Sequence, residues 1–371
     1  MKITIITPSF NQLPYLKRCI ASVADQVLPK AECLVDGCQM VVDQDGETPQ
    51  QLSNDHSSTE PALQVHHHIQ DGGSTDGTVE FLREFQSKVE SQKSNVGGEV
   101  ALNNSTTSNL STASALPEPR QPSTNNYQLT FASEADEGMY DALNKGISFV
   151  LQKQFSDNRQ LTTVNCDDEI VAWLNCDEQY LPGALQRVAH FFETRPEVDF
   201  VYGDVLMVEP EGALLMYRKN PPLRRAYVQA DHLYTQSAAM FFRAVIFSSG
   251  IRFNSAWKAV GDCDFIVRTL TDGFRPAQIK EYLAVCTMTG QNISRGSSGV
   301  NELDKFRRQG PVLFRAGRPV FNALRYFEKF LRGGYRQVTP LEYDLCMDDS
   351  NIRKKIVSET ASSRFRWDDH E

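Results

Sequence analysis

Short β-branched runs alternate with amphipathic stretches along residues 1–208. Residues 2–7, KITIIT, form an apolar run of strand length that ends at Pro8. Apolar residues then recur at helical spacing, at Leu13, Leu16, Ile20, Val23 and Val27. The pattern predicts a strand followed by a helix that packs one face on a core.

The same pairing of strand and helix recurs. Strand-like runs at 65–70, 127–132 and 170–174 each precede a segment with helical periodicity, and 198–208 supplies a fifth strand. Strands that alternate with helices of this length form βα units, in which successive strands run parallel. We therefore expect an α/β protein with a mostly parallel, Rossmann-like sheet flanked by helices.

Three polar stretches interrupt the pattern, at 29–62, 88–126 and 152–167. Their composition cannot bury enough apolar surface to offset the entropy of ordering, so we predict surface insertions, the second of them disordered. We assign residues 1–299, with these insertions, to one domain. Residues 300–371 are expected to form a C-terminal helical appendage.

The segment 305–336 has its own charge balance. It holds nine basic residues and a single acid, Glu328, with Phe, Val and Leu at roughly helical intervals. A helix of this kind can lie in a membrane interface, with its cations on anionic headgroups. It can also pack its Phe residues on the domain and leave its charges in water. The sequence leaves both interpretations open.

The whole chain, in contrast, is acidic. Its 371 residues include 38 Lys and Arg against 47 Asp and Glu, a net charge of −9, which argues against whole-chain nucleic-acid binding. Eight cysteines without a CxxC pair favour a reducing compartment. The N-terminal apolar run is too short for a signal peptide, and no run of about 18 apolar residues predicts a spanning helix. The expected location is cytoplasmic, peripheral on the inner face of the membrane if 305–336 binds lipid.

Polar clusters follow each of the first four predicted strands. They are TPSFN (7–11), QDGGSTDGT (70–78), SEADEGMYDALNKG (133–146) and NCDE (175–178). Because ligands bind outside the carboxyl ends of parallel strands, four clusters at one edge predict a site. Neither GxGxxG nor GxxxxGK[ST] occurs, which disfavours dehydrogenases and P-loop enzymes.

Asp177 and Glu178 directly follow an apolar run, where burying a carboxylate is costly without a partner. With Asn175 they offer hard oxygen atoms suited to Mg²⁺ or Mn²⁺ that bridges phosphates. Each cluster also has a purely structural interpretation. QDGGSTDGT can be a turn and helix cap, and Asp177–Glu178 can be a solvated approach to the next helix.

Taken in order with WLNCDE (173–178), YGD (202–204) and GDCDFIVRTLTDG (261–273), these clusters resemble the family-2 inverting glycosyltransferases with the GT-A fold. The resemblance covers residues 1–295, apart from the insertions. It implies a GT-A-type domain that moves a sugar from a nucleotide-sugar donor to an acceptor hydroxyl.

The resemblance also implies a donor site on the first four clusters. Asp71 would meet the base of the donor, and Asp136 would lie against the nucleotide. The donor-binding set implied in this way is Thr7, Pro8, Ser9, Asn11, Asp71, Asp136, Asn144, Lys145 and Asn175.

By the same resemblance, Asn175–Asp177 takes the place of the DxD motif, and Glu178 that of the acidic residue that often follows it. This implies a divalent cation, Mg²⁺ or Mn²⁺, held by Asp177 and Glu178. The first Asp of the common motif is Asn175 here, so Asp177 must supply most of the charge that faces the metal.

Asp262 corresponds to the catalytic base of the family. An inverting transfer is a single displacement, in which a carboxylate deprotonates the acceptor hydroxyl on the face opposite the leaving diphosphate. Asp264 is the alternative base, and Asp262 could instead cap a helix over 265–270. His232 and Gln236 are candidate contacts on the acceptor side.

The function implied by the resemblance is a hexosyltransferase that uses a nucleotide-sugar, UDP-linked by default, and a glycan or lipid-linked acceptor in polysaccharide or cell-surface glycan synthesis. A catalytically inactive GT-A module that binds nucleotide or glycan is the alternative, which the non-standard Asn175–Glu178 favours. The retention of Asp71, Asp177 and Asp262 argues against it. A sugar nucleotidyltransferase is disfavoured, because TPSFNQ bears no likeness to the Gly- and Arg-rich loop of those enzymes.

Overall fold

The computed structural model describes residues 1–27, 63–98, 126–157, 169–290, 297–348 and 352–364. Of the predicted insertions, residues 88–98 belong to α2 (Thr78–Gly98) and 152–157 to α3 (Met139–Asp157). The first insertion, at 29–62, and almost all of the rest of the other two lie outside the described residues.

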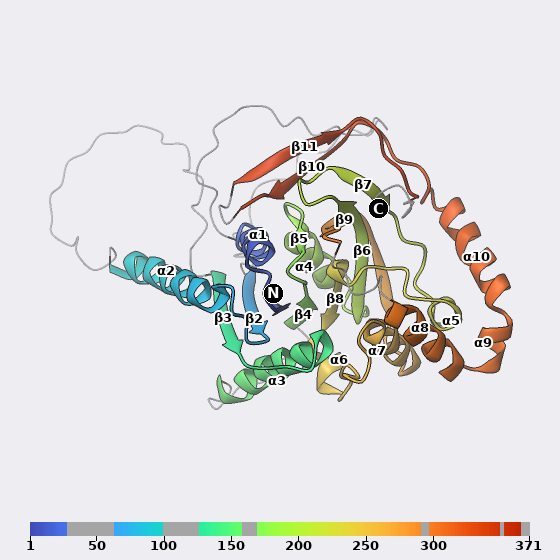
Figure 1. The fold of residues 1–371 in the computed structure, drawn as a ribbon, viewed down its shortest axis with the longest axis horizontal. Helices are drawn as coiled ribbons and strands as arrows, with labels where there is room; N and C mark the ends of the chain where they lie inside the picture. The colour runs from blue at the N-terminus through green and yellow to red at the C-terminus, as the bar shows by residue number, and fades with distance from the viewer. Residues whose placement is uncertain (28–62, 99–125, 158–168, 291–296, 349–351, 365–371) are drawn as a thin grey trace, which may run out of the picture.

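A nine-stranded sheet forms the centre of the described chain (Figure 1). Its strands follow the order β3-β2-β1-β4-β8-β6-β9-β5, and β7 pairs with β6. The strands are β1 (Lys2–Ser9), β2 (Gln64–Asp71), β3 (Tyr127–Ser133), β4 (Glu169–Trp173), β5 (Glu178–Tyr180), β6 (Phe200–Val208), β7 (Leu214–Arg218), β8 (Met240–Arg243) and β9 (Pro276–Thr287).

Most strands of this sheet run in one direction. The pairs β1–β2, β2–β3, β1–β4 and β6–β9 are parallel. Strand β8 is antiparallel to both β4 and β6, so β4 and β6 share a direction. Only β5, β7 and β8 run the opposite way among the described strands. The expected α/β class with a mostly parallel sheet is confirmed.

Helices cover both faces of the sheet because the strands bury side chains on both sides. In β1, Ile3 and Ile5 enter a core with α1 (Leu13–Ala24), α2 and α4 (Ala184–Thr194). Ile6 enters the opposite core with α3 and α7 (Gly261–Thr271). The short helices α5 (Arg225–Ala230) and α6 (Ala244–Ser248) also pack on this second face. The strand alternation therefore produces a three-layer fold.

Strand β2 shows the alternation clearly at its histidines. His67 bonds with Thr7 Oγ1 at 2.9 Å and with Tyr127 Oη at 3.3 Å on one face. His68 stacks on Phe149 of α3 on the other face. Burial, and to a lesser extent His68, lowers the pKa of His67 to about 3, so its ring is neutral near pH 7.

Residues beyond 296 are only partly helical. Helices α8 (Ser297–Gln309), α9 (Val312–Ala316) and α10 (Arg318–Leu331) lie along the outer edge of the molecule near α5 and α7 (Figure 1). Strands β10 (Leu341–Cys346) and β11 (Arg353–Ser358) then pair antiparallel. The predicted helical appendage thus ends in a β-hairpin that the sequence analysis did not predict. Leu341, Tyr343 and Leu345 alternate into a core with β6, β7 and β9, a period of two that we did not recognise in the sequence.

The β10–β11 hairpin also forms an ion pair with the main fold. The Arg353 side chain lies 2.7 Å from Asp25, the residue that follows α1, and both side chains are buried. Arg353 donates further hydrogen bonds to the carbonyl oxygens of Tyr180 and Ser22. The C-terminal strands are therefore part of the folded body.

Candidate functional site

The carboxyl ends of the parallel strands meet at one edge of the sheet. Ser9 of β1 pairs with Asp71 of β2, and Asp71 pairs with Ser133 of β3. Strand β4 continues the alignment, and the Cys176 thiol just beyond it donates to the Pro8 carbonyl at 3.1 Å. The structure thus brings together the four polar clusters that follow these strands.

The loops after β1 and β2 are joined by reciprocal hydrogen bonds. The Asn11 N–H donates to Ser74 Oγ, and the Thr75 N–H donates to Asn11 Oδ1, both at 2.8 Å. Asp76 Oδ2 accepts from the Leu13 N–H at 2.9 Å. Asn11 has a φ of 51°, in the left-handed region that Asn tolerates better than most residues. Its side chain therefore holds the two loops together at the edge where we predicted donor contacts.

Asp71 fixes the shape of the loop that it begins. Its buried carboxylate accepts from the N–H groups of Gly73 and Ser74 at 3.1 and 2.9 Å. It also accepts from Ser74 Oγ at 2.5 Å and Ser133 Oγ at 2.7 Å. Four hydrogen bonds use most of the acceptor capacity of a carboxylate. Sequence reasoning identified Asp71 and missed both serines.

The third loop meets the first two at Gly72. A β-carbon at Gly72 would lie 2.5 Å from Asp136 Oδ2 and 3.3 Å from the Phe10 ring, so only glycine leaves room for this carboxylate. Asp136 Oδ1 accepts from the Gly138 N–H at 2.8 Å. Phe10 is 60% exposed and was missed by the sequence analysis. The three loops therefore form one continuous surface with an exposed aromatic ring.

Asn144 and Lys145 of α3 hold neighbouring backbone in place. The Asn144 amide donates to the Phe253 carbonyl at 2.8 Å and accepts from the Phe253 N–H at 3.0 Å. Lys145 Nζ donates to the Ala135 carbonyl at 2.6 Å and lies 3.3 Å from Asp141 Oδ2. These contacts position the third loop and the segment before α7.

The three predicted donor-binding residues of β1, namely Thr7, Pro8 and Ser9, contact different parts of the protein. The Thr7 side chain lies fully buried in the core with His67 and Cys19, away from any open surface. Pro8 meets Cys176 through its carbonyl oxygen. The Ser9 side chain is buried at the strand end, beside the Cys176 thiol.

Asn175–Glu178 forms a tight turn between β4 and β5. Glu178 Oε2 accepts from the Asn175 N–H at 2.8 Å, and Oε1 lies 3.7 Å from the Cys286 thiol. Burial raises the pKa of Asp177, and burial together with the charge of Asp177 raises the pKa of Glu178. Asn175 Oδ1 is buried and has no hydrogen-bond partner in the described part of the chain. The turn therefore combines one buried oxygen without a partner among the described residues, Asn175 Oδ1, with two carboxyl groups whose pKa values are raised by burial.

The turn can be tested for its fit to a divalent cation. In the part of the chain that the structure describes, no group of three or more His, Cys, Asp or Glu side chains has the spacing of a metal site. Mg²⁺ is, however, often held by one or two carboxylates together with substrate phosphates and water. The Asp177 carboxylate and the unpartnered Asn175 oxygen fit that mode. The Glu178 carboxylate is engaged in the turn itself.

Asp262 lies in the first turn of α7, beside the third loop. Its Oδ1 accepts from the Cys263 N–H at 2.8 Å and from Tyr140 Oη at 3.4 Å. Burial raises the pKa of its carboxyl group. Asp264, the alternative base, forms an ion pair with Arg268 at 2.8 Å. Sequence reasoning missed Tyr140, which joins the third cluster to Asp262.

The acceptor-side candidates lie on the segment that precedes β8. His232 Nδ1 lies 2.8 Å from Asp231 Oδ2, and Gln236 is half-buried just before a 3₁₀ turn at Ser237–Ala239. The Leu233 N–H donates to the Cys263 thiol at 3.4 Å. This contact places the segment against the first turn of α7.

Asp231 is a buried centre of charge that sequence analysis missed. Its carboxylate lies 2.9 Å from Arg307 of α8 and 2.8 and 3.1 Å from Arg318 and Arg325 of α10. Burial by itself raises the pKa of Asp231, but the hydrogen bond and charge of His232, with the charges of Arg325 and Arg318, hold it well below its usual range. Asp231 therefore fixes α8 and α10 to the domain.

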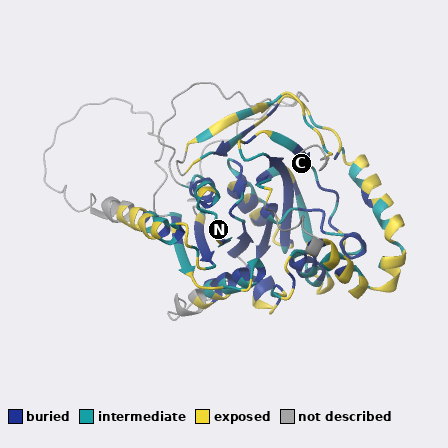
Figure 2. Ribbon diagram, viewed as in Figure 1, coloured by how far each residue is buried: buried dark blue, intermediate teal, exposed yellow. Residues whose placement is uncertain are grey.

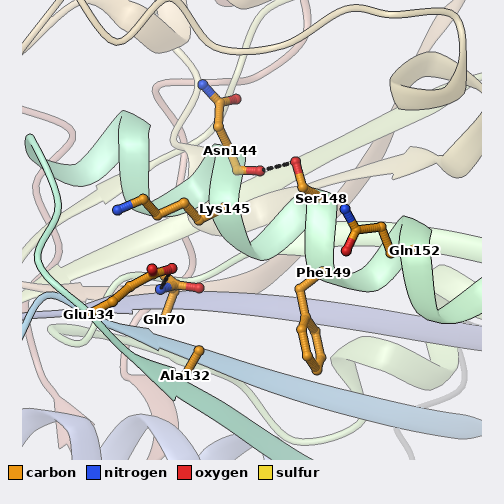
Figure 3. A pocket seen from close by; sticks show the side chains of 8 residues that line it. All are labelled: Gln70, Ala132, Glu134, Asn144, Lys145, Ser148, Phe149 and Gln152. Carbon is orange, nitrogen blue, oxygen red and sulfur yellow. Dashed lines mark hydrogen bonds between the residues drawn. The ribbon is translucent and has the colours of Figure 1, made fainter.

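A separate hollow lies between α3 and strands β2 and β3 (Figure 3). It has a volume of about 400 Å³ and is lined by Gln70, Ala132, Glu134, Asn144, Lys145, Ser148, Phe149 and Gln152. Gln70 Nε2 donates to Glu134 Oε1 at 3.3 Å within it. Because neighbouring residues of a strand face opposite ways, Gln70 and Asp71 point to opposite sides of the sheet. The hollow is therefore distinct from the loop surface around Asp71.

Comparison with known proteins finds similarity to glycosyltransferases. No family model matches the chain. Proteins named PGL/p-HBAD biosynthesis glycosyltransferase, from Mycobacterium bovis (strain BCG / Pasteur 1173P2) and Mycobacterium tuberculosis (strain ATCC 25177 / H37Ra), are 24% identical to it over 198 residues. The match covers 51% of this chain and 64% of each relative, so it spans less than two thirds of the relatives.

Solved structures of TarS from S. aureus resemble the chain more loosely. TarS 1–349 in complex with UDP has a TM-score of 0.46 and 15% identity, and the match covers 91% of this chain and 76% of that one. TarS 1–349 in complex with UDP-GlcNAc has a TM-score of 0.47 and 12% identity, with 98% and 100% covered.

Proposed function

We propose that this protein is an inverting glycosyltransferase of family 2 with a GT-A-type domain, which transfers a sugar from a nucleotide-sugar to the hydroxyl of a glycan or lipid-linked acceptor. The observation that carries the proposal is the meeting of four loops at one sheet edge, with Asp262 bound to the third through Tyr140. The order of the motifs and the names of the curated relatives support this reaction class. Hexosyl transfer from a UDP-sugar, in polysaccharide or cell-surface glycan synthesis, is the specific form that we propose.

The donor would lie on the surface formed by the first three loops and the Asn175–Glu178 turn. Phe10 offers an exposed ring against which a planar base can stack, and Asp136 lies beside it. Asn175 Oδ1 is buried without a partner among the described residues. Buried polar atoms are usually paired, so a polar group of the donor that reached this oxygen would remove an unfavourable contribution to the free energy.

The leaving diphosphate would lie at the Asn175–Glu178 turn. Asp177 and Asn175 Oδ1 would hold a Mg²⁺ or Mn²⁺ ion, which when bound offsets the negative charge of the diphosphate. Glu178 would act through the turn, because its carboxylate accepts from the Asn175 N–H. We therefore assign Glu178 to positioning Asn175 and leave Asp177 as the charged ligand.

Asp262 would act as the general base. Its carboxylate takes the proton of the acceptor hydroxyl as that oxygen bonds to the anomeric carbon and the bond from that carbon to the diphosphate breaks. Asp262 suits this task better than Asp264, whose charge is paired with Arg268. Its raised pKa makes it a stronger base than an exposed aspartate, provided that the solution pH keeps it ionised. Tyr140 Oη holds the carboxylate in position.

An inactive nucleotide-binding or glycan-binding module is the second candidate. The observation that favours it is the Glu178 carboxylate, which is turned inward and leaves Asp177 as the only carboxylate of the turn that could face a cation. Such a module would bind the donor without turnover.

A two-step experiment tests the proposal. The melting temperature is measured with UDP-, GDP- and dTDP-sugars, with and without Mn²⁺, because a ligand of the folded state raises stability by mass action. Release of the nucleoside diphosphate from the stabilising donor is then measured with a panel of glycan and lipid-linked acceptors. Stabilisation with turnover supports the transferase, and stabilisation without turnover supports the binding module. No stabilisation by any of these donors would contradict both the transferase and a nucleotide-binding module, and would leave only a glycan-binding module.

A further inference from the structure

Helix α10 turns Arg325 and Phe321 toward the domain and most of its other apolar side chains outward. Arg325, only 3% exposed, reaches Asp231 from the inner side together with Arg318. Phe327 and Leu331, on the opposite side, are 57% and 66% exposed. Figure 2 shows the outer surface of this edge as exposed. The expectation that this segment packs its Phe residues on the domain holds for Phe321, which packs against Tyr227. It fails for Phe327 and Phe330, which are exposed.

The reason for this orientation is the buried charge of Asp231. A buried carboxylate needs cationic partners. Arg318 and Arg325 can both reach Asp231 because they lie seven residues apart, on the same face of α10. Once that face is turned inward, the opposite face must point to solvent. The apolar residues exposed on this outer face of α9 and α10 are Val312, Leu313, Val320, Leu324, Phe327, Phe330 and Leu331.

Exposed cations accompany this apolar face. Arg308, Arg315, Arg332 and Arg336 are exposed around it. The one acid of the segment, Glu328, is neutralised by Arg224 at 2.8 Å. In the described chain no helix is long and apolar enough to cross a membrane. The outer face thus combines exposed apolar side chains with a positive border, which is the composition of a helix that lies in a lipid interface.

We infer that the outer face of α9 and α10 docks on an anionic lipid surface. The apolar side chains enter the boundary between headgroups and acyl chains, and the surrounding arginines contact the headgroups. Charge complementarity favours lipid over a second copy of the chain, because a twofold contact through this face would bring the arginines of both copies together. The inference does not depend on the proposed glycosyl transfer.

Sedimentation with vesicles tests the inference on the full chain. We expect binding to vesicles of phosphatidylcholine with phosphatidylglycerol, and much weaker binding to phosphatidylcholine alone. The double variant Phe327→Ser with Leu331→Ser should lose at least about tenfold in affinity, because each residue contributes apolar area to the interface. Val300→Ser with Ile352→Ser is the control, since both residues are exposed and apolar but lie outside this face. The control should bind as the wild type does.

The contribution of charge is tested separately. Arg315→Gln and Arg332→Gln should each weaken binding to anionic vesicles by about fivefold, and high salt should remove the difference. A Phe327→Trp variant supplies a direct probe of insertion. Its fluorescence should shift to shorter wavelength with anionic vesicles, whereas that of Ile352→Trp should not.

Three results would overturn the inference. One is equal sedimentation of the Phe327→Ser, Leu331→Ser variant and the control. Another is an unchanged spectrum of Phe327→Trp with anionic vesicles. The third is a wild-type chain that self-associates in analytical ultracentrifugation, binds no vesicles and becomes monomeric in the double variant. That result would assign the face to a contact between copies.

Discussion

Two aspartates of this protein, the buried Asp231 and the half-buried Asp262, differ in how their loss of hydration is compensated. Asp231 has three arginines and His232 within ion-pairing distance, and its pKa is held well below the usual range. Asp262 accepts only uncharged hydrogen bonds in the described structure, and burial raises its pKa. The pKa values of these two aspartates are thus shifted in opposite directions, although both residues lie on the second face of the sheet.

The difference separates a structural charge from candidate functional ones. The arginines that balance the charge of Asp231 fix α8 and α10 to the domain, so this charge has a structural role. At the Asn175–Glu178 turn and at Asp262, part of the cost of burial remains uncompensated, and such groups cluster at functional sites. A donor, a cation or an acceptor proton can supply the missing interaction.

The largest effect on activity should come from replacing Asp262, the proposed general base. Asp262→Asn keeps the shape of the side chain but cannot take a proton, so kcat should fall by roughly 10²- to 10⁴-fold. Donor affinity measured by calorimetry should persist. Asp264→Asn is the control, and its loss should be much smaller because that carboxylate is paired with Arg268. Loss of donor binding in Asp262→Asn would make Asp262 a donor ligand.

Removing Asp231, whose charge is balanced by arginines, should lower the free energy of unfolding. Asp231→Ala leaves the buried Arg325 without this counter-ion and Arg307 with only the exposed Asp304, at a cost of about 3–5 kcal/mol in the free energy of unfolding. Asp304→Ala removes an exposed partner of Arg307 and should cost less than about 1 kcal/mol. Urea unfolding measures both. Because the pKa of Asp231 is lowered on folding, its contribution is present above the unfolded pKa near 4 and is lost as the pH falls further. Similar costs for the two variants would contradict the assigned role of Asp231.

Asp177→Asn should remove the charge that we propose holds a cation. We expect roughly tenfold weaker binding of the nucleotide-sugar in Mn²⁺, because a hydrogen bond or contact to a charged group is typically worth 1.5–3 kcal/mol. Affinity measured in EDTA should be the same for variant and wild type. Glu178→Gln is the comparison, since Gln can still accept from the Asn175 N–H. An equal loss in Glu178→Gln would restore Glu178 as a metal ligand.

The smallest expected effect is a shift in a pH profile. As the proposed base, Asp262 would act only when ionised, so kcat/KM should fall as the pH drops through its folded pKa, which burial places above the usual value near 4. The Tyr140 hydroxyl stabilises the ionised form. Tyr140→Phe should therefore move the acid limb to still higher pH while leaving the maximum rate within about tenfold. An acid limb that does not move would show that Tyr140 does not act on Asp262.

The chain's periodicity determined strands β1 to β4 and β6, and the edge where the site lies, but not β5, β7, β8 and β9. The runs at 2–7, 65–70 and 127–132 alternate with helical segments, and parallel strands built from βα units end at a common edge. The clusters that follow them had to meet there. Local patterns were sufficient because both the strand periodicity and the direction of the strands follow from short segments of sequence.

Contacts between distant segments decided what the individual side chains do. Nothing near Asp71 in the sequence indicates that Ser133 would donate to it, and nothing near Thr7 indicates that His67 would draw its hydroxyl into the core. Helix α10 is the clearest case. Its periodicity shows that it has two unlike faces, but either face could meet the domain. The choice depends on Asp231, 94 residues before Arg325, because the energy of a buried charge is set by its neighbours in space.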